Sequence, residues 1–365
     1  LPELHFGALP PEQLPLDSWR KVILKILREN DFAVIDYDTD PFGYYPLRSS
    51  IASYLLRSRG LRCKPEQVIV FANALSHLRL FSRIFIEAGD TVAMENPGFP
   101  FARRLFTSLS AQLAPIEIDD EGIKVVELEA QDEAAKLVYV TPSHQDPTGT
   151  TMSASRRHDL LTWASDNHCL IVEDDYDCEF RYTGERIPSL AAMDKSDTVV
   201  YLGDFWKTLF PVVNVGYLVL PPGLVDAFRK AQSLSWTKED TSLPLLEKLA
   251  LTEFIENGHY ENHIKKTRET FASRYRNMVH TMTRCFGTTV QLAKDSGGMQ
   301  VLLRVNLPVR DADIVRTAAQ AGLAIIPTQP YYFERRVEKE FLLSFVKHEE
   351  SVMTACIEKW AKLLA

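Results

Sequence analysis

The segment Tyr201-Leu-Gly-Asp-Phe-Trp-Lys-Thr-Leu-Phe-Pro211 places a lysine, Lys207, directly after a short apolar stretch. We predict a strand over residues 198–202 and a second strand over Gly216-Tyr-Leu-Val-Leu220. An ammonium group between two buried strands is costly unless it has a partner or a chemical role, because burial disfavours its charged form. The segment alone leaves two interpretations open: a surface lysine in a loop, or an amine that forms a Schiff base with an aldehyde cofactor.

Three further apolar stretches upstream of Lys207 also end in polar loops. They run into Asn96-Pro-Gly-Phe-Pro100, Thr141-Pro-Ser-His-Gln-Asp-Pro-Thr-Gly149 and Glu173-Asp-Asp-Tyr-Asp177. In an α/β sheet, the ends of the strands deliver polar groups into one ligand crevice. The four strand ends together therefore predict a single catalytic crevice.

The order of the expected elements predicts an α/β fold with two domains. Short apolar strands alternate with helical segments between about residue 65 and residue 225, which is typical of a mostly parallel sheet with helices on both faces. We expect an N-terminal arm and helix over residues 1–30, a large domain over residues 31–265 and a small C-terminal α/β domain over residues 266–365. The small domain should contain strands near 301–305, 324–326 and 341–345 and a closing helix over 350–365.

The composition excludes several classes of protein. The net charge of −8 argues against a nucleic-acid partner, and we find no apolar run long enough for a membrane span. The five cysteines are scattered without a Cys-x-x-Cys pair, so we expect neither a disulfide framework nor a metal site. Together with the absence of a signal-peptide pattern, this predicts a cytoplasmic protein.

Several motifs together resemble a known family. They are Gly43-Tyr-Tyr-Pro-Leu-Arg48, Asn96-Pro-Gly-Phe-Pro100, Thr141-Pro-Ser-His-Gln145, Pro147-Thr-Gly149, Glu173-Asp-Asp-Tyr176 and Lys207-Thr-Leu-Phe-Pro211. In this order and at these separations, they resemble the fold-type I pyridoxal 5′-phosphate (PLP) enzymes of the aminotransferase class I/II superfamily. The resemblance is strongest to the aminotransferase-like domain of MocR-type regulators and covers nearly the whole chain from about Phe6. Those regulators carry a winged-helix domain before this point, and none is present in the sequence from Leu1 onward; for a complete chain this would favour an enzyme.

The resemblance implies a role for each matching residue around PLP. Lys207 would bind the cofactor covalently, and Asp174 would keep the pyridine nitrogen protonated, with Asp175 as the alternative one residue along. Tyr176 would hydrogen-bond the phenolate oxygen of the cofactor, and Phe99 would cover the ring face.

The resemblance also implies how the phosphate group is held. The main-chain amides of Ala74 and Leu75, with the hydroxyl of Ser76, would form a cup at a helix N-terminus. Tyr37 would reach a phosphate across the interface of a homodimer, which is the assembly that the family implies.

The sequence departs from the family pattern at several positions in the expected site. Asp204 and Trp206 stand where relatives have small hydroxyl residues before the lysine, and Asp146 stands where they have Asn or Phe before Pro-Thr-Gly. Two arginines of the family are also replaced: Asn214 stands at the position of a phosphate-binding arginine, and Leu342 at that of the carboxylate-binding arginine. Loss of one arginine and gain of one acid should weaken phosphate binding. The added carboxylates would instead suit a cationic substrate side chain.

These departures decide which reaction we expect from the sequence. We favour a PLP enzyme that removes the α-proton of an amino acid and then eliminates from or cyclises the side chain of a hydroxylated, arginine-like substrate. An aminotransferase that uses an amino acid and an oxo acid is the first alternative. A non-catalytic, ligand-sensing MocR-like domain is the second.

Overall fold

The computed structural model describes residues 8–29, 40–131, 133–184, 187–234, 243–293, 297–334 and 336–364. Its main feature is an eight-stranded sheet with the order β1-β8-β7-β6-β5-β2-β3-β4. The strands are β1 (Val68–Phe71), β2 (Thr91–Asn96), β3 (Gln112–Asp119), β4 (Gly122–Ile123), β5 (Leu137–Val140), β6 (Leu170–Asp174), β7 (Val199–Asp204) and β8 (Gly216–Val219). Strands β3, β2, β5, β6 and β7 run parallel to one another. Strand β8 pairs antiparallel with both β7 and β1, and β4 pairs antiparallel with β3. The predicted mostly parallel α/β fold is confirmed.

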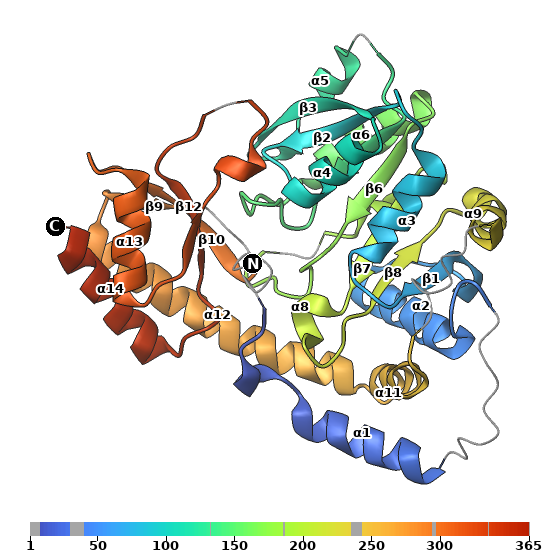
Figure 1. Cartoon of the computed structure of the whole chain (residues 1–365), viewed down its shortest axis with the longest axis horizontal. Coiled ribbons are helices and arrows are strands. Elements are labelled where there is room, and N and C mark those ends of the chain that lie inside the picture. Colours follow the sequence, from blue (N-terminus) through green and yellow to red (C-terminus); the bar gives the residue numbers. More distant parts are fainter. Residues whose placement is uncertain are drawn as a thin grey trace.

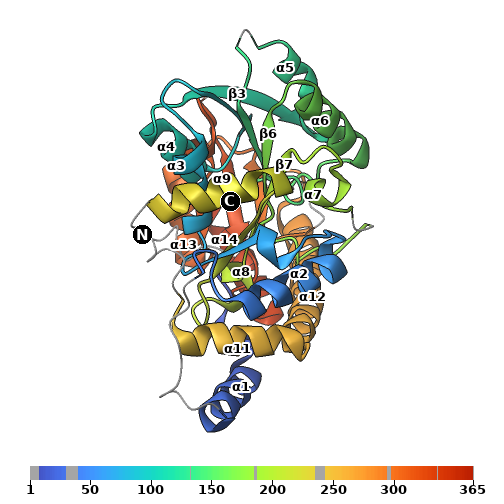
Figure 2. The same ribbon diagram turned by 90° about the vertical axis from the view of Figure 1, so that its right-hand side faces the viewer.

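Helices cover both faces of this sheet. Figure 2 shows α3 and α4 on one side of β3 and β6, and α5 and α6 on the other. The helices of this domain are α2 (Tyr45–Arg59), α3 (Ser76–Phe85), α4 (Pro100–Ser108), α5 (Val125–Glu129), α6 (Ala154–Asp166), α7 (Leu190–Met193), α8 (Trp206–Leu209) and α9 (Pro222–Leu234). Two apolar layers result, because successive side chains of a strand point to opposite faces.

The alternation along β6 decides which acids face which layer. Val172 packs into the cluster with residues of α3, α4 and α9, whereas Ile171 packs into the cluster with residues of α5 and α6. Asp174 therefore lies on the α3 and α4 face, and Glu173 on the α6 face. The end of one strand thus delivers neighbouring carboxyl groups to opposite sides of the sheet.

A long helix joins the large sheet to the C-terminal sheet. Helix α1 (Leu16–Glu29) packs on α11 (Leu245–Glu256), and α12 (His259–Phe286) follows Gly258, which has a φ of +70°. In Figure 1, α12 runs from the region of α8 and α11 to the C-terminal elements. The segment before the C-terminal sheet is thus two helices, and the predicted domain boundary at residues 265 and 266 lies inside α12.

The C-terminal elements form the smaller sheet that the sequence predicts, and its strands pair antiparallel. Its order is β11-β12-β10-β9. The strands are β9 (Val290–Leu292), β10 (Gln300–Val305), β11 (Ile325–Pro327) and β12 (Glu340–Ser344), and the helices that pack on them are α13 (Asp311–Ala321) and α14 (Glu350–Leu364). Trp360 of α14 is fully buried, and its ring meets Phe286 edge-on at a centroid distance of 5.0 Å. No helix in the described part of the chain is long and apolar enough to cross a membrane.

Two loops of the small domain contact the large domain. The main-chain amide of Gly298 donates to the carbonyl of Phe180 at 2.7 Å, and Tyr182 donates its hydroxyl to the carbonyl of Gly298 at 2.5 Å. On the other side, the guanidinium of Arg103 donates to the carbonyls of Pro330 and Tyr332, both at 2.6 Å. These contacts place the small domain beside the loops that follow β2 and β6.

Gly203 on β7 provides a test of the packing under the lysine segment. A Cβ atom at this position would lie 2.4 Å from Cζ of Tyr217 on the neighbouring strand, and the Tyr217 ring is buried between other aromatic rings. We expect Gly203→Ala to lower the free energy of unfolding by about 1–3 kcal/mol, because the ring has little room to move.

The matched control is Gly223→Ala in the first turn of α9, where an added Cβ meets nothing within 4 Å. This change should be neutral or slightly stabilising. Urea unfolding of both variants measures the difference. Equal stabilities would show that the strand packing around Gly203 is wrong.

Candidate active site

Lys207 lies on the short helix α8 immediately after β7. One carboxylate oxygen of Asp204 accepts hydrogen bonds from the main-chain amides of Trp206 at 2.7 Å and Lys207 at 3.3 Å, so it satisfies amides that a helix start leaves without partners. The Lys207 Nζ lies 5.4 Å from the ring centroid of Tyr176 and 5.2 Å from that of Trp206. The lysine amine therefore lies over two aromatic rings, and one predicted substrate contact, Asp204, has a structural task.

Asp174 is a buried carboxyl group with one neutral partner. The hydroxyl of Tyr139 on β5 donates to Asp174 Oδ2, and among the described residues Asp174 forms no ion pair. Burial raises the pKa of Asp174 to about 8; the Tyr139 hydrogen bond lowers it in part, and the charges of Asp204, Asp146 and Asp175 raise it further. The carboxyl thus lacks a cation, although ionised groups are normally buried only with one.

Asp175 has the opposite environment, on the other face of the strand end. Its Oδ2 lies 2.7 Å from Nε of Arg59 and accepts the hydroxyl of Tyr201 at 2.7 Å. Burial alone would raise the pKa of Asp175, but the Arg59 charge and the hydrogen bonds hold it below its usual value. Asp175 is therefore compensated by protein groups, whereas Asp174 is not, and the geometry favours Asp174 among the two predicted alternatives.

Glu173 also has a structural task. Its two oxygens accept the main-chain amides of Leu190 and Ala191 at the start of α7, each at 2.8 Å, and Arg157 lies 3.6 Å away. The acidic motif after β6 therefore separates into acids that hold the fold and one acid that faces the lysine side of the sheet.

Asp146 and Asp204 surround the lysine with negative charge. Burial raises the pKa of Asp146 to about 7 and that of Asp204 to about 6, and the charge of Lys207 opposes the rise in both. Asp146 is almost fully buried and Asp204 is half-buried. The predicted site residues Lys207, Asp146, Asp174 and Asp204 are thus electrostatically coupled in one place.

A carboxyl group that the sequence did not single out ties two site loops together. Glu95 at the end of β2 accepts the main-chain amide of Thr141 at 3.1 Å and its hydroxyl at 2.7 Å. The side-chain amide of Gln145 donates to Glu95 at 3.3 Å and to the carbonyl of Pro97 at 2.7 Å. These bonds position the loop that carries Asp146.

The predicted phosphate cup lies at the start of α3. The main-chain amide of Leu75 donates to the side chain of Asn73 at 2.9 Å, and that of Ala74 meets the Asn214 side-chain oxygen at 3.4 Å. A Cβ on Gly216 would lie 2.9 Å from Cα of Ala74, so only glycine allows this close approach. Ser76 is buried as the first residue of α3.

The remaining predicted residues are placed as follows. Phe99 lies between β2 and α4, half-buried, with its ring 5.9 Å from that of Phe101, and its role over the cofactor stays a prediction. Leu342, at the position of the missing arginine, is fully buried against Leu302 on β10. Tyr37 lies outside the described residues. The structure likewise describes no group of three or more His, Cys, Asp or Glu side chains that could hold a metal ion.

Whether these residues suit PLP depends on the two ends of the cofactor. The ring end fits, because Asp174 is a buried carboxyl that pairs with no cation among the described residues, and because the charges of Asp146 and Asp204 act on both Asp174 and Lys207. The phosphate end fits in part: the main-chain amides of Ala74 and Leu75 donate to side-chain oxygens, which a phosphate oxygen can replace. Asn214 adds no charge there, and its main-chain amide bonds the carboxylate of Glu247.

Comparison with known proteins identifies the family. The model of the family described as aminotransferase class I and II matches residues 5–357, and the chain belongs to this family. PLP is the cofactor that this membership implies.

Individual relatives agree with this assignment. The HTH-type transcriptional regulator YdeL of Bacillus subtilis is 34% identical over 98% of this chain and 75% of its own length. The probable rhizopine catabolism regulatory protein MocR of Rhizobium meliloti is 31% identical over 96% of this chain and 69% of its own length. The solved structure of Pyrococcus horikoshii kynurenine aminotransferase, a complex with PMP, has a TM-score of 0.86 at 27% identity and covers 98% of this chain and 89% of that one. The predicted resemblance to fold-type I enzymes and MocR-type domains is confirmed.

The raised pKa of Asp174 predicts a pH-dependent stability for the cofactor-free protein. An ordinary aspartate has a pKa near 3.8, whereas Asp174 in the fold has a pKa of about 8. Between these values the folded state keeps a proton that the unfolded state has lost, so stability falls as the pH rises from about 4 to about 8. We expect Asp174→Asn to raise the free energy of unfolding at pH 8 by at least about 1 kcal/mol, with little effect at low pH.

Asp175→Asn is the matched control. The pKa of the Asp175 carboxyl is lowered in the folded protein, so its negative charge stabilises the fold at pH values above the pKa of an ordinary aspartate. Asp175→Asn should therefore destabilise the protein at pH 8. Urea titrations at both pH values measure these changes. A loss of stability at pH 8 in both variants would contradict the uncompensated state of Asp174.

Proposed function

We propose that this protein is a PLP-dependent aminotransferase that exchanges an amino group between an amino acid and a 2-oxo acid. One observation carries the proposal: the amine of Lys207 and the buried, uncompensated carboxyl of Asp174 share one site in a chain of the aminotransferase class I and II family. The 27% identical kynurenine aminotransferase supports the same reaction type.

Each residue of the site has a task in this proposal. Bound PLP supplies an electron-withdrawing ring that stabilises negative charge at the α-carbon of the substrate. Lys207 would hold the cofactor and then accept and return the substrate α-proton at Nζ, as a general base and acid. The carboxylate of Asp174 would hold a proton on the ring nitrogen, because a nearby negative charge favours the protonated form.

The other predicted residues would bind and orient. The amides of Ala74 and Leu75 and the side chains of Ser76 and Asn214 would hold the phosphate. Tyr176 would donate its hydroxyl hydrogen to the phenolate oxygen of the cofactor, and its ring lies over the lysine amine. Phe99 would exclude water from one face of the ring.

The reaction favoured by the sequence, elimination or cyclisation on a hydroxylated basic amino acid, finds no support in the relatives described above. None of the three is named as a lyase or cyclase. One oxygen of Asp204, which the sequence assigned to a cationic substrate, instead bonds the first amides of α8. We therefore prefer the alternative that the sequence left open, an aminotransferase.

A ligand-sensing domain is the second candidate. It is favoured by the names of the two regulators that are 34% and 31% identical to this chain. A sensor binds an amino acid without releasing the swapped product pair, so sustained turnover distinguishes the two functions.

The test follows product formation from an amino acid and a 2-oxo acid with the PLP-loaded protein. We expect the swapped amino acid and oxo acid to accumulate over many turnovers. Lys207→Ala should reduce the rate by about 10²–10⁴-fold, the range lost with a general base. Asp174→Asn should reduce it by about 10²–10³-fold, because one lost charge partner removes roughly 3–4 kcal/mol of transition-state stabilisation.

Lys195→Ala, in the exposed segment after α7, serves as the lysine control and should keep the full rate. Borohydride reduction followed by peptide mapping should locate the cofactor on Lys207. Tight binding of an amino acid with no turnover would instead support the sensor, and a cofactor fixed to another lysine would remove the basis of the site.

A further inference from the structure

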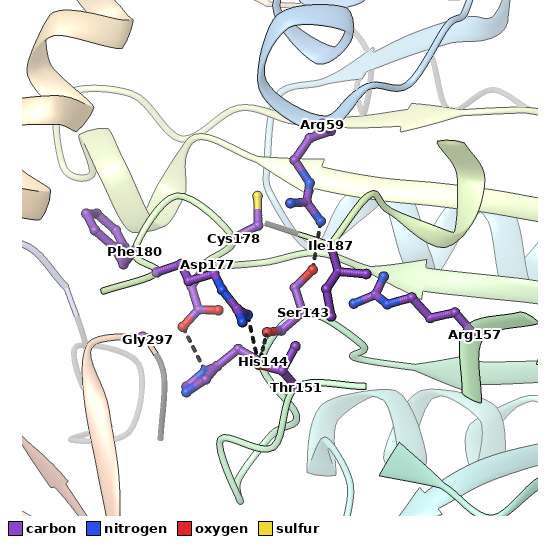
Figure 3. A pocket seen from close by; sticks show the side chains of 12 residues that line it. Arg59, Ser143, His144, Thr151, Arg157, Asp177, Cys178, Phe180, Ile187 and Gly297 are labelled. Atoms are coloured by element: carbon purple, nitrogen blue, oxygen red, sulfur yellow. Dashed lines mark hydrogen bonds and ion pairs between the residues drawn. The ribbon is translucent and has the colours of Figure 1, made fainter. Parts of the chain in front are cut away.

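Two buried residues near the Tyr176 hydroxyl, His144 and Asp177, have no role in the proposed reaction described above. The Nδ1 atom of His144 lies 3.0 Å from the hydroxyl oxygen of Tyr176 and 3.0 Å from Oδ2 of Asp177. His144 and Asp177 are 5% and 4% exposed. Figure 3 shows the imidazole of His144 beside the carboxylate of Asp177, in the wall of a polar cavity that Arg59, Ser143 and Thr151 also line.

The two contacts share one nitrogen, and this restricts where the proton lies. A carboxylate oxygen only accepts hydrogen bonds, so the 3.0 Å approach of Asp177 Oδ2 favours a proton on Nδ1 of His144. A protonated Nδ1 cannot accept a hydrogen bond from Tyr176. The hydroxyl oxygen of Tyr176 is therefore the acceptor at this contact, and its own hydrogen points away from His144.

The ring of His144 is held in place from the small domain. A Cβ atom on Gly298 would lie 2.2 Å from Cε1 and 2.7 Å from Nε2 of His144, so the imidazole lies directly on the glycine backbone. Gly298 has a φ of +78° and is itself fixed to Phe180 and Tyr182 by hydrogen bonds. The position of the small domain thus sets the orientation of His144.

Several charged groups surround this contact. Asp177 belongs to the loop after β6, and the charge of Asp146 interacts with His144 from the loop after β5. Arg59 of α2 and Arg181 line the same cavity. Among the described residues, Asp177 is the carboxylate at hydrogen-bonding distance from Nδ1, and its charge favours the tautomer protonated at Nδ1.

We infer that Asp177 and His144 form a positioning pair that fixes the direction of the Tyr176 hydroxyl and so directs its hydrogen toward the cofactor. The inference rests on the proposed function, because it assigns a task to residues that act on the cofactor through Tyr176. His144 and Asp177 are positioning residues, since neither is placed against the reacting atoms.

The test uses the pH midpoint of the absorbance change of the PLP-loaded protein. A hydrogen bond donated to the phenolate oxygen stabilises its anion, so Tyr176→Phe should raise the midpoint by about one pH unit, a tenfold change in proton affinity. His144→Phe and Asp177→Asn should each raise the midpoint in the same direction, by about two- to tenfold in proton affinity. The double variant Tyr176→Phe/His144→Phe should match Tyr176→Phe alone, because His144 acts only through that hydroxyl.

The control is Ser143→Ala in the same cavity wall. This change removes a hydroxyl whose oxygen accepts a hydrogen bond from the Arg59 guanidinium at 2.7 Å. Its midpoint should equal that of the wild type. An unchanged midpoint in His144→Phe, or a His144→Phe shift that adds in full to that of Tyr176→Phe, would overturn the inference.

A second measurement uses the cofactor-free protein. Nitrogen NMR of labelled histidine should show His144 protonated on Nδ1, and Asp177→Asn should shift it toward the Nε2 tautomer because an amide can donate to Nδ1. A wild-type His144 protonated only on Nε2 would overturn the inference while leaving the proposed aminotransferase reaction intact. Failure of the protein to bind PLP, in contrast, would contradict the proposed function and the inference together.

Discussion

The site depends on how the carboxyl groups at the end of β6 are compensated. Glu173 bonds the first amides of α7 and lies near Arg157, and Asp175 pairs with Arg59 and Tyr201. Asp174, on the other face, pairs within the described part of the chain with the neutral hydroxyl of Tyr139 and with no cation. Because a buried carboxylate without a cation is destabilised, the fold leaves a position in which a positively charged ring nitrogen is favoured.

Contacts from other segments position Lys207 and the loops around Asp174. Asp204 starts the helix that carries Lys207, and Glu95 and Gln145 hold the loop that carries Asp146. The small domain reaches the same place through Gly298, which lies against His144. At the phosphate end the described residues provide the amides of Ala74 and Leu75, and Glu247 adds a carboxylate whose pKa is raised by burial. The charge complementarity of the site is therefore concentrated at the ring end of the cofactor.

Much of this architecture could be predicted from local sequence pattern. Strands β7, β8, β10 and β12 and helix α14 lie within a few residues of their predicted bounds, because short buried strands and amphipathic helices carry strong local signals. Lys207 and Asp174 could be found because Asp174 is the last residue of β6 and Lys207 comes three residues after the end of β7. The choice between Asp174 and Asp175 was open, since it depends on which face of the sheet each side chain occupies.

Other parts of the site could not be predicted, because they depend on contacts between distant segments. Tyr139 looked like an ordinary strand residue, and only the pairing of β5 with β6 brings its hydroxyl to Asp174. His144 and Asp177 come together from the loops after these two strands. Asp204 was assigned to a substrate, whereas one of its oxygens bonds amides only two and three residues away; the brevity of α8 hid that helix start in the sequence.

The central claim is that Asp174 supplies the negative charge for a protonated cofactor ring. Its most direct test is nitrogen NMR of the protein loaded with PLP labelled at the pyridine nitrogen. The account predicts a ring nitrogen that stays protonated from about pH 6 to about pH 9 in the wild type and loses its proton in Asp174→Asn. A wild-type ring nitrogen without a proton at neutral pH, or one that Asp174→Asn leaves unchanged, would contradict the account.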